Sequence, residues 1–457
     1  MLNARPISNY KDHQECTKYT ILHFFVPVPP SCPLWLNNNS VCIYFLVKHY
    51  IFTHVNQKIA IIGGGAAGFF AALSVKQHHP GAEVVIFEKS QKVLAKVKVS
   101  GGGRCNVTNG CSEIDELIKA YPRGGRKLKW AFKEFNTTDT VQWFEDRNVP
   151  LTLQDDGCYF PVSQNSQSVI DCLMNECRRG KIEILIGKGV EQIRPIEEKI
   201  ELTFKDEVLI FNKVIIATGG SPKTSGLDWL AQLGHKIEEC VPSLFTFNMP
   251  NESVRELMGI VKEEVITTIQ GTKLKGDGPL LITHWGMSGP AILKLSAFGA
   301  RILADRNYDF KVLVNWTNEP NLKKVSDEIQ SIERAHPNKL LSNVKPYGIK
   351  ERLWLHLLDR AGQAPTKRWE ELGKKGFNKL LETLTNDTYE VKGKTTFKEE
   401  FVTCGGVSLD EINMSSMESR VVPNLYFAGE VMDIDAITGG YNFQAAWTTG
   451  FIAGKLS

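Results

Sequence analysis

The stretch that decides the fold is KIAIIGGGAAG, from Lys58 to Gly68. Its first five residues form an apolar run typical of a buried parallel strand. The pattern G-x-G-x-x-G follows and opens a helical stretch, Phe69–His78, after which Val84–Phe87 reads as a second strand. Strand, glycine turn, helix and strand within about 30 residues make one βαβ unit. The stretch therefore predicts an α/β fold with a Rossmann-like domain.

Each glycine of this motif has a physical reason to be there. Gly63 allows the tight turn, Gly65 leaves room for a pyrophosphate, and Gly68 lets the helix pack closely on the strand. The helix N-terminus offers free N–H groups and a positive dipole end to phosphate. Glu88, which ends the second strand, accepts hydrogen bonds from a ribose diol and repels a 2′-phosphate. The motif thus predicts NAD or FAD and disfavours NADP.

The far end of the chain favours FAD. Leu425–Ala428 reads as a returning strand, and the turn Thr438–Asn442 opens a helix expected over Phe443–Ala453. A glycine turn before a helix forms a second site for an anion or a carbonyl. FAD is long enough to need both sites, with adenine at one end and isoalloxazine at the other. The alternative, a helix that only caps the sheet, remains open.

Two further glycine clusters fit the same groove. Ser100–Asn106 (SGGGRCN) holds three consecutive glycines, and backbone without side chains permits close approach to a ligand. Arg104 in this cluster is expected to hold a phosphate or a flavin carbonyl, and Asn106 an amide edge. Ala217–Gly220 (ATGG) follows the apolar strand VIIA, at the sheet edge where ligands bind.

The pattern of apolar and charged residues changes between Pro242 and Phe401. Val261–Gln270 and Asp309–Val314 are rich in β-branched residues and predict strands, whereas Glu319–Asn386 alternates charged and apolar residues and predicts helices. The charges of this helical part are expected to form a solvated face and not a docking site. The predicted division is a leader over 1–57, a first nucleotide-binding part over 58–244, an inserted β domain over 245–318, a helical subdomain over 319–386, a return of the β domain over 387–400 and a second nucleotide-binding part over 401–457.

Residues 1–57 differ from the rest of the chain. They contain none of the 38 glycines, and prolines, asparagines, Lys48 and His49 interrupt every apolar run. The stretch matches neither a membrane span nor the order of regions in a signal peptide. We interpret it as translated upstream sequence, with a native start near Val55 or Asn56. Intact-mass measurement tests this, and a mass matching all 457 residues would contradict it.

Composition bounds the function. The hydrophobic fraction of 42% and the charged fraction of 23% are those of a globular protein. The net charge of +3 gives no sign of a nucleic-acid partner. Ten cysteines without any C-x-x-C predict neither a redox dithiol nor a metal site, and they fit a cytoplasmic protein. No membrane association is expected, and oligomeric state is left open.

Several motifs together resemble one family, the BaiN/YhiN-like flavoproteins. The matching stretches include KVSGGGRCNVTN, VIIATGGSPKTSG, THWGMSGPAIL, VTCGGVSLDEI and LYFAGEVMDIDAITGGYNFQAAWTTG, and they lie between Lys58 and Gly450. Cys404 and Ala436 depart slightly from the pattern. The resemblance implies a glutathione-reductase-like FAD domain with an inserted β-barrel-like domain and a helical subdomain. With the residues chosen from the motifs themselves, the candidate cofactor-binding set is Gly63, Gly65, Ala66, Ala67, Gly68, Glu88, Lys89, Gly102, Gly103, Arg104, Asn106, Val190, Ala217, Thr218, Gly219, Gly429, Glu430, Asp433, Gly439, Gly440, Tyr441 and Asn442.

A flavin carries the redox chemistry, and protein groups orient and tune it. The first hypothesis is a reductase that passes hydride from flavin N5 to a small enone-like substrate. No second G-x-G-x-x-G occurs. The reductant therefore visits the substrate cavity, as NAD(P)H would transiently, or is another protein, or is the substrate itself. An oxidase of a small amine that uses oxygen is the alternative. A flavin-dependent RNA-modification or RNA-binding protein is a remote alternative, disfavoured by the near-neutral charge.

A reductase of this kind also needs a proton donor. His284, in the inserted domain, is the first candidate, although it is equally compatible with a structural role in a turn. Tyr441 is the reserve candidate. Cys105 is interpreted mainly as a packing residue, with a redox role beside the flavin as the lesser option.

Overall fold

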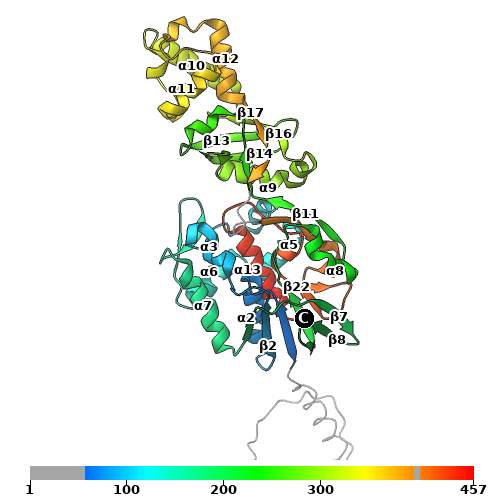
Figure 1. The fold of residues 1–457 in the computed structure, drawn as a ribbon. Helices are drawn as coiled ribbons and strands as arrows, with labels where there is room; N and C mark the ends of the chain where they lie inside the picture. The colour runs from blue at the N-terminus through cyan, green and yellow to red at the C-terminus, as the bar shows by residue number, and fades with distance from the viewer. Residues whose placement is uncertain (1–56, 396–401) are drawn as a thin grey trace, which may run out of the picture. The chain divides into compact units, whose positions relative to one another are not determined.

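The structure is a computed structural model that describes residues 57–395 and 402–457, all within one compact unit, Asn56–Ser457 (Figure 1). The interpretation of the leader therefore lies outside the described residues, as do the last residues of the predicted segment 387–400. Within the two described ranges, no helix is both long enough and apolar enough to cross a bilayer.

A mainly parallel sheet forms the centre of the nucleotide-binding part. Its order is β20-β21-β22-β10-β1-β2-β6, and the five strands from β22 to β6 are parallel. The register aligns Ile61 with Ile215 on one side and with Ile86 on the other, and all three are fully buried. Burial of both faces explains why these strands read as continuous apolar runs. The strands are β1 (Lys58–Ile62), β2 (Glu83–Glu88), β6 (Glu183–Ile186), β10 (Lys213–Ile216), β20 (Ile412–Asn413), β21 (Glu418–Ser419) and β22 (Leu425–Phe427).

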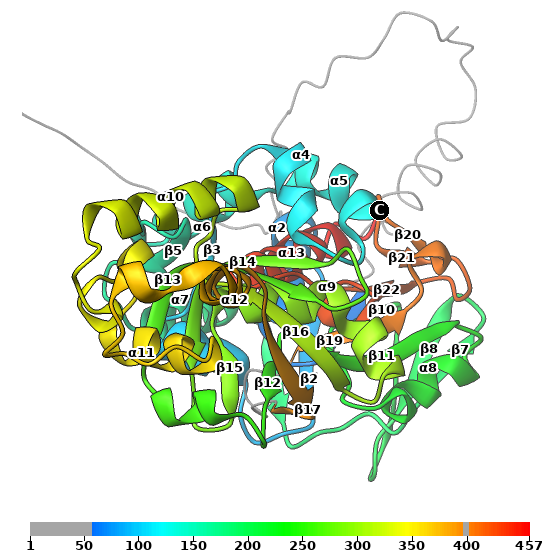
Figure 2. The same cartoon turned by 90° about the horizontal axis from the view of Figure 1, so that it is seen from above.

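Helices α2 (Ala66–His78) and α13 (Tyr441–Ala453) lie side by side, the first in blue and the second in red in Figures 1 and 2. Small residues bring them together: a Cβ on Gly450 would lie 2.7 Å from the Ala67 carbonyl oxygen, and one on Gly454 2.5 Å from Ser74 Cβ. The first and last predicted helices of the Rossmann-like part thus form one packed layer. The other helices here are α3 (Ala95–Gly103), α4 (Ile114–Leu117), α5 (Gly125–Glu134), α6 (Thr137–Glu145), α7 (Ser166–Arg179) and α8 (Asp228–Gln232).

Two small antiparallel sheets belong to the same part of the molecule. One, in the order β7-β8-β9, connects β6 to β10, and the other has the order β3-β5-β4. Ile200 and Leu202 of the first are fully buried in the main hydrophobic cluster. Their strands are β3 (Thr108–Asn109), β4 (Leu151–Leu153), β5 (Cys158–Pro161), β7 (Gln192–Ile196), β8 (Lys199–Thr203) and β9 (Val208–Phe211).

The inserted part is a seven-stranded antiparallel sheet in the order β17-β16-β13-β14-β15-β12-β18. One stretch of chain forms both edges, because β18 follows β17 after Gly393 alone. The sheet therefore closes on itself in a barrel-like manner, as the resemblance implied. Its strands are β12 (Thr246–Asn248), β13 (Val261–Ile269), β14 (Lys275–Ile282), β15 (Gly286–Ser288), β16 (Asp309–Asn315), β17 (Asp387–Lys392) and β18 (Lys394–Thr395).

Helices fill the connections of the inserted part. The long helix α9 (Pro290–Asp305) packs on the sheet, and three more helices lie between β16 and β17. These are α10 (Leu322–Ala335), α11 (Glu351–Arg360) and α12 (Gly373–Asn386). The predicted strands and helices of this region are therefore present.

The buried hydrophobic residues of the described ranges form two large clusters and a small third one of Val241, Ala300 and Cys404. One cluster belongs to the Rossmann-like part and a second to the barrel and its helices, with fully buried Trp316, Trp354 and Trp369 in the second. The antiparallel pair of β11 (Ile237–Ser243) and β19 (Val402–Val407) joins the two parts. We keep the division near residues 244 and 401 as a proposal on the basis of these two cores.

Candidate cofactor site

The three motif glycines have the roles that their positions predict. Gly63 has φ +116°, and a Cβ there would lie 2.3 Å from the Ala217 carbonyl oxygen. A Cβ on Gly68 would lie 1.9 Å from the Gly63 carbonyl oxygen, whereas one on Gly65 would meet nothing within 4 Å. Gly63 and Gly68 thus close the loop, and Gly65 keeps open the space before the N-terminus of α2. That cradle fits a pyrophosphate.

Glu88 secures this loop from the end of β2. One carboxylate oxygen accepts from the Gly64 N–H at 2.8 Å, and the other accepts from the Ser90 N–H at 2.7 Å. A carboxylate has about four lone-pair sites, so it retains capacity for a ribose diol. The chain also returns here: the Lys188 N–H donates to the Glu88 carbonyl oxygen at 2.9 Å, which brings Val190 toward Glu88 and Lys89.

The Ser100–Asn106 cluster and the Thr438–Asn442 turn contact each other. In the orientation that pairs both ends of its amide, Asn106 donates to the Thr108 carbonyl oxygen at 3.0 Å and accepts from the Gly440 N–H at 3.2 Å. The Asn109 amide donates to the Gly439 carbonyl oxygen at 3.0 Å. Two clusters more than 330 residues apart in the chain therefore form one wall of the site.

The backbone of the SGGGRCN cluster is left-handed over consecutive residues. Gly101, Gly102 and Gly103 have φ of +56°, +69° and +85°, and a Cβ on either of the last two would meet nothing within 4 Å. This open backbone suits a planar ligand. Arg104, by contrast, is occupied by the protein: its guanidinium carbon lies 4.1 Å from the centre of the Phe160 ring, and Nε donates to the Gly101 carbonyl oxygen.

Other predicted residues lie near the same loops but already have protein partners. Glu430 accepts from Lys96 Nζ at 2.8 Å and from the Thr403 N–H at 2.7 Å. Asp433 accepts from Arg301 with both oxygens at 3.0 Å. The Asn442 amide holds both the N–H and the carbonyl of Ala436, so its side chain shapes the turn.

Ala217, Thr218 and Gly219 follow β10, and Gly429 follows β22, at the carboxyl ends of neighbouring parallel strands. Gly219 has φ +75° with open space around it. Gly429 has φ +76°, and a Cβ there would lie 2.8 Å from Ala67 Cβ. Both turns thus reach the edge of the sheet at which α2 begins, which is where ligands bind in such folds.

The spacing of α2 and α13 argues for a long cofactor. Their contacts pair Ala67 with Gly450 and Ser74 with Gly454, so the two helices run in the same direction. Tyr441 starts α13 nine residues before Gly450, and Ala66 starts α2 one residue before Ala67. The N-terminus of α13 therefore lies eight residues, about 12 Å at 1.5 Å per residue, beyond that of α2. One ligand that uses both helix starts must be extended, as FAD is.

The two candidate proton donors have different surroundings. Tyr441 lies at the N-terminus of α13, and burial raises the pKa of its phenol to about 12. His284 is exposed in the tight turn between β14 and β15, where its ring contacts that of Trp285. In the described ranges no hydrogen bond, ion pair or ring contact joins His284 to the glycine loops.

Cys105 is fully buried, and burial raises the pKa of its thiol to about 12. A neutral, enclosed thiol is a poor nucleophile, which agrees with a packing role.

A buried ion pair beside the site has no counterpart in the sequence analysis. Arg123 pairs with Asp435, whose side chain is fully buried, and Asp435 also accepts from Ser243 Oγ at 2.6 Å. The Arg123 guanidinium also donates to the Ala297 carbonyl oxygen of α9 at 2.6 Å. These contacts connect the chain just before the Thr438–Asn442 turn with helix α9 of the inserted part. Two acids, Asp433 and Asp435, interrupt the apolar run Val431–Ile437, and they were the one local signal for this pair.

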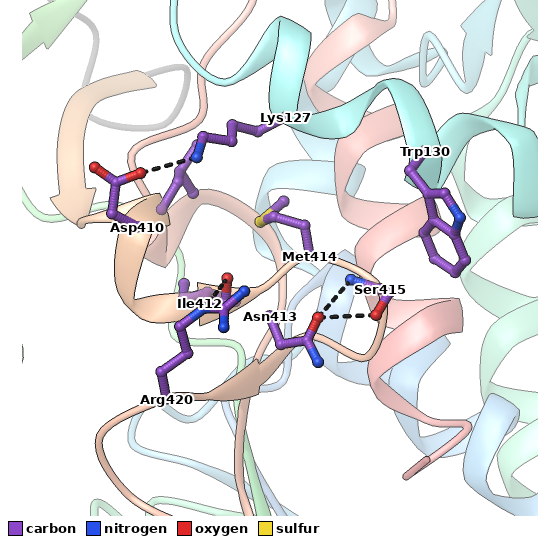
Figure 3. A pocket seen from close by; sticks show the side chains of 9 residues that line it. Lys127, Trp130, Asp410, Ile412, Asn413, Met414, Ser415 and Arg420 are labelled. Atoms are coloured by element: carbon purple, nitrogen blue, oxygen red, sulfur yellow. Dashed lines mark hydrogen bonds and ion pairs between the residues drawn. The ribbon is translucent and has the colours of Figure 1, made fainter.

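Open pockets elsewhere do not coincide with these loops. Figure 3 shows one of about 470 Å³ between α5 and the 409–420 segment. Its polar groups pair with each other: Lys127 Nζ lies 2.8 Å from an Asp410 oxygen, and Asn413 Oδ1 accepts from Ser415 Oγ at 2.8 Å. A second, of about 590 Å³, lies beside Trp143 and Arg147. Neither includes a residue of the predicted set. Binding of the cofactor at the glycine loops stays a prediction.

The matching family model is described as the HI0933-like protein Rossmann domain, and it covers residues 57–456. The chain belongs to this HI0933-like family. It is accordingly an FAD-dependent oxidoreductase, as the resemblance to BaiN/YhiN-like flavoproteins implied.

Curated relatives align with this HI0933-like chain over nearly their whole length. Ribosomal RNA dihydrouridine synthase of Escherichia coli (strain K12) is 31% identical over 86% of this chain and 95% of its own. The 3-dehydro-bile acid delta(4,6)-reductase of Clostridium scindens is 26% identical over 88% of this chain and 99% of its own. Ribosomal RNA dihydrouridine synthase of Haemophilus influenzae is 26% identical over 86% and 96%.

Proposed function

We propose that this chain is an FAD-dependent reductase that adds hydride and a proton across a carbon–carbon double bond conjugated to a carbonyl, and that its substrate is a uridine base in ribosomal RNA. The names of the relatives support the reaction. A dihydrouridine is a uridine whose ring double bond, conjugated to a carbonyl, has gained two hydrogens. A delta(4,6)-reductase of a 3-dehydro compound likewise saturates double bonds conjugated to a ketone.

The chain's residues divide the work of holding the cofactor. The N-terminus of α2 would hold the pyrophosphate, Glu88 would hold the ribose diol, and the loops that Asn106 and Gly440 join would hold the ring system. When bound, FAD supplies the hydride, which it receives beforehand from a reductant such as NAD(P)H. With no second G-x-G-x-x-G in the chain, a nicotinamide reductant would have to reach the flavin through the substrate's own site.

The observation that carries the proposal is Tyr441 at the junction of the two glycine loops. Hydride addition to one carbon of a conjugated double bond leaves negative charge that a proton must neutralise at the other carbon. With its pKa raised to about 12, the Tyr441 phenol stays protonated at neutral pH. Because its ring lies beside Gly439 in the Thr438–Asn442 turn, we assign it the role of general acid. His284 is the second candidate donor.

A small free enone is a second candidate substrate. The bile-acid reductase aligns over 99% of its own length, slightly more than the dihydrouridine synthases do. The same groove would then take a steroid-like ring in place of a nucleobase.

Anaerobic half-reactions test the proposal. The holoprotein is mixed with NADH or NADPH, and bleaching of the flavin absorbance is expected. The reduced protein is then given ribosomal RNA that lacks the modification, or a 3-oxo-4,6-diene steroid acid. We expect reoxidation by RNA, and nucleosides heavier by two hydrogens in mass spectrometry. Reoxidation by the steroid alone would replace RNA with the second substrate. Bleaching by small amines with oxygen-dependent recovery, and no reaction with either enone, would overturn the proposal in favour of an oxidase.

A further inference from the structure

Positive charge is concentrated in one short segment of the inserted part. Residues 339–379 contain ten Lys or Arg and four Asp or Glu, a formal net charge of +6. The whole chain carries only +3, so all other residues together carry −3. An average over the chain conceals this asymmetry, and asymmetry of this kind marks a surface for a polyanion.

The fold gathers the basic residues of this segment at one place. The backbone around Lys339 pairs with the backbone around Arg368: the Leu341 N–H donates to the Lys367 carbonyl oxygen at 2.7 Å, and the Trp369 N–H to the Lys339 carbonyl oxygen at 3.0 Å. A short 3₁₀ turn, Trp369–Glu371, then leads directly into the start of α12. We call the set Lys339, Lys367, Arg368, Lys374 and Lys375 the basic cluster.

Most of this charge is not neutralised within the protein. Lys339, Lys374 and Lys375 are exposed, and among the described residues none of them has an ion-pair partner. Of the nearby acids, Glu370 pairs with Arg368 at 3.8 Å, and Glu371 accepts from the Arg368 backbone N–H at 2.9 Å.

The chemistry of the surface distinguishes between polyanions. A helix that binds a membrane needs large apolar side chains exposed beside its basic residues. Within residues 339–379, all of them described, no large hydrophobic side chain is exposed. Flexible lysines without an apolar face suit a phosphate backbone, because that contact is electrostatic and does not depend on sequence.

We infer that the basic cluster is a docking surface for RNA, which it holds by the phosphate backbone while a base enters the cofactor groove. This inference rests on the proposed function for its biological partner, and it replaces the expectation of a merely solvated face.

Equilibrium binding of the holoprotein to protein-free ribosomal RNA, as a function of salt, tests the inference. The variant K339E/K374E/K375E is compared with K181E/K199E/K205E, which reverses three exposed lysines in the Rossmann-like part and reaches the same net charge. We expect the first variant to lose about tenfold or more in affinity, and its salt slope to fall by about three. The second should stay close to the wild type. Flavin content and NAD(P)H bleaching serve as checks that both variants are folded.

The outcomes separate the surface from the reaction. Equal weakening by both variants would mean that only net charge matters and would overturn the inference, while uridine reduction could still be observed. Binding of anionic phospholipid vesicles as tightly as RNA, lost in the first variant alone, would also overturn it in favour of a membrane. Selective loss of RNA binding without any reduction of uridine by the wild type would support the surface and reject the proposed reaction.

Discussion

At the scale of single residues, substitution of two glycines of one motif should have different effects, on FAD affinity in one case and on stability in the other. Gly65→Ala places its methyl group in open space, in an extended backbone with φ −94°. The apoprotein should keep its stability and lose FAD affinity, because the methyl group occupies the pyrophosphate position. Gly68→Ala places a methyl group 1.9 Å from a backbone oxygen and should destabilise the apoprotein by about 1–3 kcal/mol.

Denaturant unfolding of the apoproteins, together with titration of FAD fluorescence, checks this pair. Equal loss of stability in both variants would contradict the assignment of separate roles to Gly65 and Gly68.

Tyr441 offers a second test at this scale. Tyr441→Phe removes the proton donor, so the rate of substrate reduction should fall about 100-fold while reduction of the flavin by NAD(P)H is unchanged. Because its pKa is raised to about 12, the phenol should impose no pH dependence near neutrality. The wild-type rate should decline only as the pH approaches 12 and the phenol loses its proton.

Stopped-flow measurement of the two half-reactions checks this prediction. Tyr121→Phe is a matched control, since it removes a phenol that donates to the Tyr441 carbonyl oxygen at 2.7 Å. That control should cost about 1 kcal/mol of stability and affect the rate less. A normal rate in Tyr441→Phe would transfer the role of donor to His284 or to water.

At the scale of elements, the pair of Arg123 and Asp435 should matter more than the surface pairs. Asp435→Asn removes the charge that faces Arg123, whose side chain is only 10% exposed. The buried guanidinium is left unpaired, so the free energy of unfolding should fall by about 3 kcal/mol or more. Asp410→Asn breaks the pair with Lys127, in which both side chains are at least half exposed, and should cost less than about 1 kcal/mol. Chemical denaturation of both variants checks the contrast, and similar losses would contradict it.

Elements also show what sequence can predict. The strands at Lys58, Val84, Val214 and Leu425 were predicted because burial of both faces leaves a continuous apolar run. Helices α2 and α13 begin two or three residues earlier than predicted. In both, the helix starts directly after the glycine turn. Ala66–Gly68 are small, and Tyr441 and Asn442 continue the glycine motif, so both stretches were assigned to the turn.

The candidate cofactor site was predictable in part. Separate glycine clusters indicated one cofactor site, and the structure brings the clusters around Asn106 and Gly440 together. Arg123 and Asp435 were missed because their contact joins residues 312 positions apart, which no local pattern encodes. Whether each remaining residue of the predicted set touches FAD stays a prediction.

At the scale of the whole molecule, two separate hydrophobic cores predict two thermal transitions. If FAD is held by the Rossmann-like core alone, as proposed, it should raise one transition and leave the other nearly fixed. An FAD concentration 100 times the Kd should stabilise the binding part by about 2.7 kcal/mol. Differential scanning calorimetry of apoprotein and holoprotein checks this. A single transition, or two that move equally, would show that the cores unfold as one.

The pairing of α2 with α13 has a consequence for biosynthesis. A ribosome makes α2 early and α13 last among the described elements, with the whole inserted barrel between them. The barrel, which has its own core, can fold while the first helix still lacks its neighbour. Nascent chains stalled before Tyr441 should therefore resist protease over the inserted part and yet retain no flavin. Cofactor loading would then follow synthesis of α13, which makes FAD occupancy a marker that this helix has been made and packed against α2.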